Sequence, residues 1–214
     1  MDAGAGHNDR VTGSTRGRSA AKRAAILEAA RQLFLADGYD RTSVDAIAAK
    51  ADVSKRTVYD HFGDKEAVYA AVIGAAGRAL LGSIEAALTG ELEPARDLRE
   101  ALLGFARRIA TRTFPSSEYA TFRALTAADN PRPAHWPAAA GGAAPTVPEP
   151  EQLLVERFAE YARAGRLEAP NPHRAAEHFI ALTLRLALEA RPADVDAVLV
   201  DGVDAFLRAY APRP

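Results

Sequence analysis

Two short helices, each bounded by start and stop signals, constrain the fold of this chain more than any other feature. They lie within residues 42–63, "TSVDAIAAKADVSKRTVYDHFG". Thr42 and Ser54 are residue types that accept hydrogen bonds from the free N–H groups at a helix start, and Gly63 favours the conformation that ends a helix. Helices of about seven residues are not stable alone in water. They must pack against a longer helix, which the spacing of apolar side chains predicts over residues 21–37.

The apolar residues of the two short helices have the spacing of a tri-helical helix-turn-helix unit. Ile47 and Ala48 face inward from the second helix, and Val58 and Phe62 face inward from the third. Asp52 stands in the turn, where it tolerates the left-handed backbone conformation better than most residues. The side chains left on the outside of the third helix are Lys55, Arg56, Thr57, Tyr59 and His61. This polar face either contacts an anion such as nucleic acid or is a solvated helix face.

The whole sequence predicts an all-α fold of about nine helices, the three of the helix-turn-helix unit included. Apolar spacing of three and four residues recurs along the chain, and no segment alternates convincingly like a strand. Residues 1–18 lack periodicity and are predicted to form a disordered arm. The helix-turn-helix domain is placed at residues 19–66 and a second helical domain at residues 67–214. Within the latter, residues 129–150 are rich in Pro, Gly and Ala and are predicted to be a loop.

Composition excludes several classes of protein. The chain has 214 residues and no cysteine, which excludes disulfides, thiolate metal sites and a cysteine nucleophile. No run of 18 uncharged apolar residues occurs, and the N-terminus lacks the apolar stretch of a signal peptide, so we predict a cytoplasmic protein with no membrane partner. The net charge is −1, but every lysine lies in the first 66 residues, so any polyanion-binding surface is local.

No set of catalytic or cofactor-binding residues stands out in the sequence. It contains neither a glycine-rich phosphate loop nor the metalloprotease and serine-hydrolase motifs. His173 and His178 lie among apolar residues of one predicted helix, and we predict no metal site there. We therefore expect a protein that is not an enzyme and that binds no cofactor.

The segment "TSVDAIAAKADVSKRTVYDHFGDKEAVY" resembles the DNA-binding signature of the TetR/AcrR family of bacterial transcriptional regulators, over about residues 21–72. The rest of the chain resembles that family only in the number and order of its helices. The resemblance implies that the helix starting at Ser54 enters the major groove of double-stranded DNA. Lys55 and Arg56 would then read bases, with Thr57 between base and phosphate. The residues implied to contact phosphates are Thr42, Ser43, Tyr59, His61 and Lys65.

Further charged side chains extend this expectation. Arg16 and Arg18 would reach along the DNA backbone or into its minor groove. Asp60 would either accept a hydrogen bond from a cytosine amino group or face solvent. Arg56 stands where the family often has a small residue, so the target sequence cannot be borrowed from relatives.

The family also implies a second domain that binds a ligand and forms a dimer. Apolar residues of the middle helices, each individually more typical of a core, together allow an apolar pocket. They are Phe105, Ile109, Phe122, Phe158, Tyr161 and Phe179. The last two predicted helices are apolar on more than one side, so one side would meet a second copy of the chain. The predicted dimer contacts are Ile180, Leu184, Leu188 and Leu199, and the alternative is burial within one subunit.

Together these features predict a homodimeric transcriptional regulator, a repressor that binds a palindromic operator and responds to a small apolar ligand. Ligand binding would change the separation of the two recognition helices, which must be about 34 Å to fit one DNA turn. The rival interpretation is an all-helical small-molecule carrier or enzyme with an incidental tri-helical N-terminus.

Overall fold

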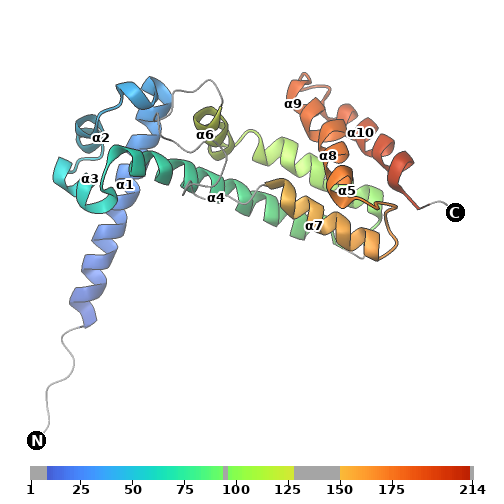
Figure 1. The fold of residues 1–214 in the computed structure, drawn as a ribbon, viewed down its shortest axis with the longest axis horizontal. Coiled ribbons are helices and arrows are strands. Elements are labelled where there is room, and N and C mark those ends of the chain that lie inside the picture. Colours follow the sequence, from blue (N-terminus) through green and yellow to red (C-terminus); the bar gives the residue numbers. More distant parts are fainter. Residues whose placement is uncertain (1–8, 94–95, 128–149, 213–214) are drawn as a thin grey trace, which may run out of the picture. The chain divides into compact units, whose positions relative to one another are not determined.

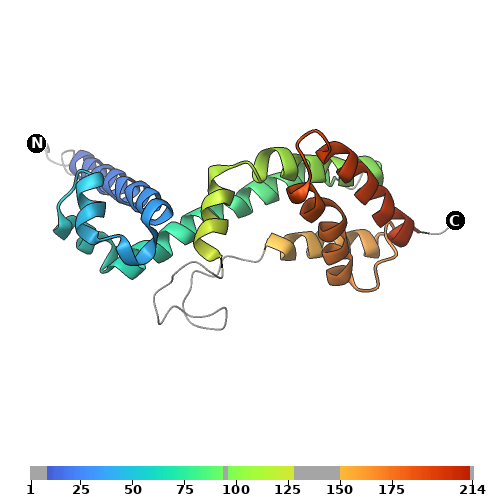
Figure 2. The ribbon, with the colours of Figure 1, turned by 90° about the horizontal axis from the view of Figure 1, so that it is seen from above.

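The computed structural model describes residues 9–93, 96–127 and 150–212, and within them the chain is helical without a strand (Figure 1, Figure 2). This confirms the predicted all-α class. The N-terminal helices are α1 (Asp9–Arg41), α2 (Val44–Lys50), α3 (Lys55–Phe62) and α4 (Lys65–Glu91). The following helices are α5 (Leu98–Arg108), α6 (Ser117–Thr126), α7 (Pro150–Arg163), α8 (Pro172–Ile180), α9 (Leu186–Glu189) and α10 (Val195–Tyr210).

Two short π-helical turns join some of these helices into longer continuous segments. The turn η1 (Ile109–Thr113) follows α5 directly, and η2 (Ala181–Arg185) connects α8 to α9. Counted as continuous segments, the described residues form nine helices, which is the predicted number. The predicted loop over residues 129–150 lies outside the described residues except for Pro150, which begins α7.

The first helix begins earlier than the sequence predicts. It starts at Asp9, inside the segment 1–18 that composition predicts to be disordered. Once a helix nucleus exists, each added residue gains a hydrogen bond, so a helix can continue into a segment without an apolar face. The prediction is therefore wrong for residues 9–18, whereas residues 1–8 lie outside the described part. Near the end of α1, Gly38 has a φ of 80° and kinks the helix where the sequence predicts a stop.

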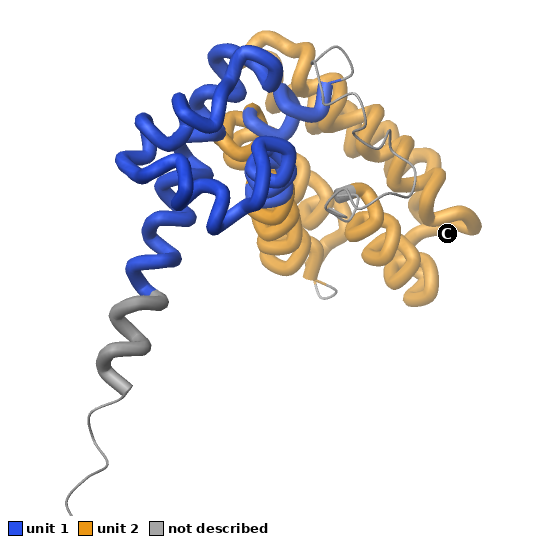
Figure 3. Tube along the Cα trace, turned by 60° about the vertical axis from the view of Figure 1, so that its left-hand side comes forward, with its two compact units in different colours: residues 1–75, 121–146 blue, residues 76–120, 147–214 orange. Residues whose placement is uncertain are grey.

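The chain forms two compact units, which are drawn in different colours in Figure 3. Unit 1 comprises Met1–Ala75 and Thr121–Thr146, and unit 2 comprises Ala76–Ala120 and Val147–Pro214. Helices α4 and α6 each contribute residues to both units. The predicted domains, residues 19–66 and 67–214, have other boundaries than these two compact units. The functional division of the chain therefore stays a prediction.

Unit 1 has a core in which α2 and α3 pack against α1 and the start of α4. Ile47, Ala48 and Val58 are buried there, as their spacing predicts. The buried Tyr69 hydroxyl donates to the carbonyl oxygen of Leu125 at 3.0 Å, which satisfies its polar end and joins α6 to this core. Burial of the apolar sides of α2 and α3 thus orders two helices that could not persist alone.

The turns around α3 follow the predicted signals. Ser54 caps the helix, and Gly63 ends it with a φ of 87°. Asp64 then accepts a hydrogen bond of 2.7 Å from a backbone N–H in the first turn of α4. Asp52 has a φ of 53°, which confirms the left-handed conformation expected in the turn between α2 and α3.

The start of α2 differs from the prediction. Ser43, not Thr42, caps this helix, and its Oγ accepts from the N–H of Ala46 at 3.1 Å. Thr42 is buried, and its hydroxyl donates to the carbonyl oxygen of Gly38 at 2.8 Å. Both residue types cap helices. The backbone bend at Gly38 determines which of the two residues caps α2. It places the carbonyl oxygen of Gly38 within reach of the Thr42 hydroxyl, which leaves Ser43 as the cap.

One helix, α4, is long and apolar enough to cross a membrane by length and composition. Half of its most apolar stretch is buried inside the protein. Val68 and Tyr69 are fully buried in unit 1, and Leu80 and Leu81 are buried in unit 2. The apolar character of α4 is therefore accounted for by its packing in the cores of the two units.

An aromatic cluster lies at the centre of unit 2. Phe158, Phe179 and Phe206 are fully buried, and their ring centroids are 5.3, 5.4 and 5.6 Å apart. These spacings are typical of favourable aromatic pairs. Because the three rings come from α7, α8 and α10, the cluster holds these helices together.

Two charged pairs fasten α5 to α10. Arg99 Nε donates to Asp204 Oδ1, and Arg107 Nε donates to Asp196 Oδ1, both at 2.6 Å. A second, parallel hydrogen bond joins each pair. These hydrogen bonds lower the pKa of both carboxylates. Exposed pairs contribute little stability, so their main effect is on the register of the two helices.

Helix α10 approaches η2 closely at Gly202. A Cβ at this position would lie 2.1 Å from the carbonyl oxygen of Leu182 and 2.9 Å from Thr183 Cγ2. A carbonyl oxygen of the backbone cannot rotate away as a side chain can, so the contact requires glycine.

We predict that Gly202→Ala lowers the free energy of unfolding by about 1–3 kcal/mol, because α10 must shift away from η2. Gly82→Ala is the matched control, since Gly82 is exposed in α4 and has no heavy atom within 4 Å of its Cβ position. It should stabilise the protein by roughly 0.5–1 kcal/mol. Urea unfolding followed by circular dichroism measures both, and equal stability of the two variants would contradict the close contact.

Candidate nucleic-acid interface and ligand pocket

The N-terminal turn of α3 is capped and exposed. Ser54 Oγ accepts from the N–H of Thr57 at 3.1 Å, and the two hydroxyl oxygens lie 2.8 Å apart. This cap satisfies one of the free N–H groups at the helix start and fixes its direction. Val58 is buried beneath the turn. Lys55 and Arg56 are exposed beside Ser54 in this turn, and Tyr59 and Asp60 are exposed in the next.

The two cations of α3 each face a carboxylate of unit 1. Lys55 Nζ donates to Asp45 Oδ2 at 2.9 Å, and this hydrogen bond raises the pKa of Lys55. Arg56 Nε lies 3.8 Å from Asp60 Oδ2, and 90% of the Arg56 side chain is exposed. Lys55 is therefore held by α2 in a defined position, whereas Arg56 extends into solvent.

Two residues predicted to contact phosphate are engaged within unit 1. The Thr42 side chain is buried and its hydroxyl donates to the carbonyl oxygen of Gly38, so its contact with phosphate stays a prediction. Lys65 Nζ donates to the carbonyl oxygens of Tyr39 and Thr42 at 3.0 and 3.1 Å and lies 4.1 Å from the Tyr39 ring centroid. Lys65 thus joins α4 to the segment after Gly38, a structural role that sequence reasoning missed.

The other predicted phosphate contacts keep accessible polar groups. Ser43 is exposed at the start of α2, and Tyr59 is 43% exposed on α3. His61 is half-buried beside the ring of Phe62. Arg18 is exposed on α1, and the Arg16 side chain lies outside the described part of the chain.

Unit 2 contains an apolar cavity of about 260 Å³, called the unit 2 cavity below. Its lining residues are Leu80, Ile84, Phe105, Ile109, Thr113, Phe114, Tyr119, Glu151, Leu154, Ile180, Leu184, Arg185 and Leu188. Both π-helical turns contribute, with Ile109 and Thr113 from η1 and with Leu184 and Arg185 from η2. A π turn carries an extra residue that displaces side chains from their regular rows, and such turns are frequent at functional sites.

The predicted ligand-lining residues divide between this cavity and the cores. Phe105 and Ile109 line the cavity. The residues that are buried in the core of unit 2 instead are Phe158, Tyr161 and Phe179, and Phe122 packs against the core of unit 1. Periodicity identifies an apolar helix face, but it does not identify which neighbour covers that face.

The predicted dimer contacts stay a prediction, and the residues named for them have neighbours within one chain as follows. Ile180, Leu184 and Leu188 line the unit 2 cavity, and Leu199 is buried with 1% exposure. Ile180, Leu184 and Leu199 therefore have neighbours within the same chain. The large apolar side chains that stay exposed on α9 are those of Leu186 and Leu188.

Sequence reasoning missed the polar groups of the cavity. Thr113 Oγ1 lies 2.9 Å from Ser83 Oγ, and Glu151 and Arg185 add one charge of each sign to the lining. The high apolar content of α4 could have indicated that this helix contributes to the lining of the cavity. The helix carries more apolar residues than packing against a single core would bury. The polar groups come from separate segments and give no local signal.

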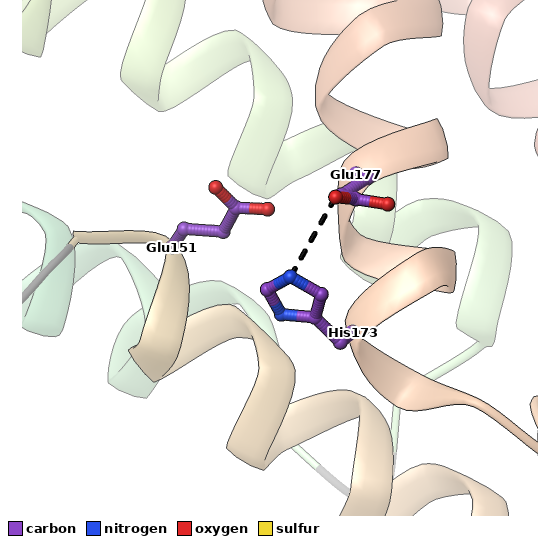
Figure 4. Close-up of side chains that lie close together, drawn as sticks. All are labelled: Glu151, His173 and Glu177. Carbon is purple, nitrogen blue, oxygen red and sulfur yellow. Dashed lines mark ion pairs between the residues drawn. The ribbon is translucent and has the colours of Figure 1, made fainter.

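Three titratable side chains of unit 2 also lie together. The ligand atoms of Glu151, His173 and Glu177 are all within 4.8 Å of one another (Figure 4). His173 Nε2 is 3.6 Å from Glu177 Oε1. The prediction of no metal site at His173 overlooked Glu177, which follows four residues later and so lies on the same helix face.

Two family profiles match the chain. The profile of "Bacterial regulatory proteins, tetR family" matches residues 26–72, and that of the "AefR-like transcriptional repressor, C-terminal domain" matches residues 100–212. The HTH-type transcriptional regulator TcmR of Streptomyces glaucescens is 39% identical over 66 residues, which cover 31% of this chain and 29% of TcmR. The chain thus spans less than a third of the length of the first curated relatives it matches.

Two solved structures are similar over most of the chain. A TetR-family transcriptional regulator from Mesorhizobium loti has a TM-score of 0.70 and 27% identity, with 91% of this chain and 98% of that one covered. The flavonoid-responsive regulator FrrA has a TM-score of 0.59 and 26% identity, with 90% and 98% covered.

The fold and the exposed turn of α3 define a helix-turn-helix protein whose second, all-helical unit contains an apolar cavity that is open to solvent. The C-terminal family profile alone covers more than half of the chain. The chain belongs to the TetR family of bacterial regulatory proteins.

We predict that Asp45→Asn raises non-specific DNA affinity and lowers discrimination between DNA sequences. The variant frees Lys55 from its carboxylate and adds one net positive charge, so the slope of log affinity against log salt should steepen by about one. Fluorescence anisotropy with two unrelated duplexes at several salt concentrations measures both effects. Asp37→Asn, an exposed carboxylate of α1, changes net charge equally. An equal loss of discrimination in this control would show that Asp45 acts through charge alone.

Proposed function

We propose that this protein is a DNA-binding transcriptional repressor that acts in the cytoplasm as a homodimer on a palindromic operator. The observation that carries the proposal is the capped and exposed N-terminal turn of α3, which lies within the residues matched by the TetR profile. The match of the C-terminal residues to a repressor domain supports repression as the mode of regulation. The family match does not favour a carrier or an enzyme with an incidental tri-helical start.

In this proposal α3 lies in the major groove with its N-terminal turn against the base edges. Arg56, whose side chain is 90% exposed, forms two hydrogen bonds to O6 and N7 of a guanine. Lys55 donates as a point charge from the position that Asp45 gives it. Ser43 and Tyr59 contact phosphates, which sets the register of the protein on DNA without reading sequence.

The second copy of the chain packs on α9 and the adjoining surface of α10. Leu186 supports this placement, because it is 48% exposed and does not line the unit 2 cavity. Leu188, two residues further along, is 42% exposed but points to another side of the helix, where it lines the cavity. A two-fold axis makes the same patch meet itself, as an isologous dimer requires. It also presents two copies of α3, which read the two halves of a palindrome one DNA turn apart.

The ligand occupies the unit 2 cavity and is small and mainly apolar. The aliphatic and aromatic lining supports this class, and the charges of Glu151 and Arg185 provide for a polar substituent. Similarity to a flavonoid-responsive regulator supports an aromatic ligand. A ligand that binds one arrangement of the dimer more tightly shifts the population away from the arrangement that fits DNA.

An electrophoretic mobility shift assay on the DNA upstream of this gene tests the regulator proposal. We expect a complex that contains two copies of the chain, that depends on sequence and that weakens with salt. We predict that Arg56→Ala keeps non-specific binding but reduces discrimination against a changed guanine by about 1–3 kcal/mol. Equal weakening on every sequence would place Arg56 on a phosphate, and no sequence-dependent complex with the wild type would overturn the proposal.

We predict that Ile180→Trp abolishes ligand binding while leaving the affinity for the operator unchanged, because the indole fills the cavity. A thermal-shift screen of apolar compounds, flavonoids among them, first identifies a ligand of the wild type. A ligand at 100 times its Kd should raise the Tm by about 5–10 °C. Val155→Trp is the control, since Val155 is also half-buried in unit 2 but does not line the cavity. An unchanged shift in Ile180→Trp would place the ligand elsewhere.

A further inference from the structure

Three side chains with metal-ligating atoms converge between α7 and α8. Figure 4 shows Glu151 projecting from the first turn of α7 toward His173 and Glu177, which project from one face of α8. The two α8 residues are four apart, the spacing that brings side chains together on a helix. Two ligands thus come from one rigid helix and the third from a second helix.

The contacts around this group leave its ligand atoms available. Arg174 Nε lies 3.6 Å from Glu177 Oε2, whereas Glu177 Oε1 faces His173 Nε2 at 3.6 Å. Both distances exceed those of normal hydrogen bonds. Glu151 is half-buried and has no ion pair with any residue that the structure describes. Two carboxylates and an imidazole therefore lie close together with only long contacts to compensate their charge.

The distances suit a metal ion after a small adjustment. In a tetrahedral site with metal–ligand bonds of about 2.0 Å, neighbouring ligand atoms are about 3.3 Å apart. The Nε2–Oε1 distance of 3.6 Å is already near this value. All three ligand atoms lie within 4.8 Å of one another, and His173 and Glu177 are exposed side chains whose rotation can close the remaining gap.

The donor set indicates which metal the group would select. Imidazole favours zinc, nickel, copper and iron over magnesium and calcium, which prefer oxygen ligands alone. Three protein ligands, here one nitrogen and two carboxylate oxygens, leave the fourth position of a tetrahedral zinc ion open for water or another molecule.

We propose that Glu151, His173 and Glu177 form a binding site for a divalent transition metal of the zinc class. The site goes beyond the proposed regulator function and does not depend on DNA binding. Because Glu151 also lines the unit 2 cavity, the metal ties α7 to α8 beside that cavity. Its open position is then available to an oxygen or nitrogen atom of a molecule bound there.

Isothermal titration of the tag-free 214-residue protein with zinc chloride tests the site directly. We expect saturable binding of one zinc ion per chain and much weaker binding of magnesium. Glu151→Gln and His173→Asn should each lower the zinc affinity at least about tenfold. Cobalt(II) should give the visible absorption of a four-coordinate nitrogen–oxygen site in the wild type, and His173→Asn should lose it.

Matched controls separate this site from incidental zinc binding. Glu156→Gln removes an exposed carboxylate from α7, and His178→Asn removes an exposed histidine from α8, both outside the group. Both controls should keep the wild-type zinc affinity and the cobalt spectrum. Metal-free thermal unfolding checks that every variant is folded, and Glu177→Gln replaces any variant that is not. The absence of saturable zinc binding, or equal loss in the controls and the site variants, would overturn the proposal.

Discussion

The exposed face of α3 depends on the burial of Ile47, Ala48 and Val58 in the core of unit 1. Helices of seven and eight residues do not persist in water, so α2 and α3 are ordered by packing against α1 and α4. The same packing decides which side chains stay outside. Val58 is 1% exposed, which prevents α3 from rotating about its axis, and Lys55 and Arg56 consequently face solvent.

Most of unit 1 could be predicted from the sequence because its signals are local. Ser54, Asp52 and Gly63 act on backbone groups within about four residues, and the structure places each of them as expected. The cap of α2 could not be predicted, since Thr42 and Ser43 offer the same hydroxyl chemistry. A contact of Thr42 with the kinked end of α1 distinguishes them, and such contacts leave no trace in local sequence.

The sequence predicts only Phe105 and Ile109 among the residues that line the unit 2 cavity. The rest of the lining could not be predicted, because it is assembled from distant segments and two π turns. Along the continuous helix from α8 to α9, Phe179 enters the core, Leu184 lines the cavity and Leu186 faces solvent. Periodicity shows that this helix is apolar on several sides, but tertiary structure assigns a neighbour to each side. The sequence therefore predicts that this helix has neighbours on more than one side. It does not predict that some of the residues expected in the dimer interface line the cavity.

The charged side chains proposed to bind DNA or a metal ion have only weak ionic partners within their own units. The pair of Lys55 with Asp45 is exposed, so it contributes little to stability and mainly fixes the position of the ammonium group. Glu151 and Glu177 likewise have only weak compensation within their unit. A group with a weak internal partner loses little when a phosphate, a base edge or a metal ion replaces that partner. The free energy of binding then comes from the difference between the old and new partners, which keeps binding reversible.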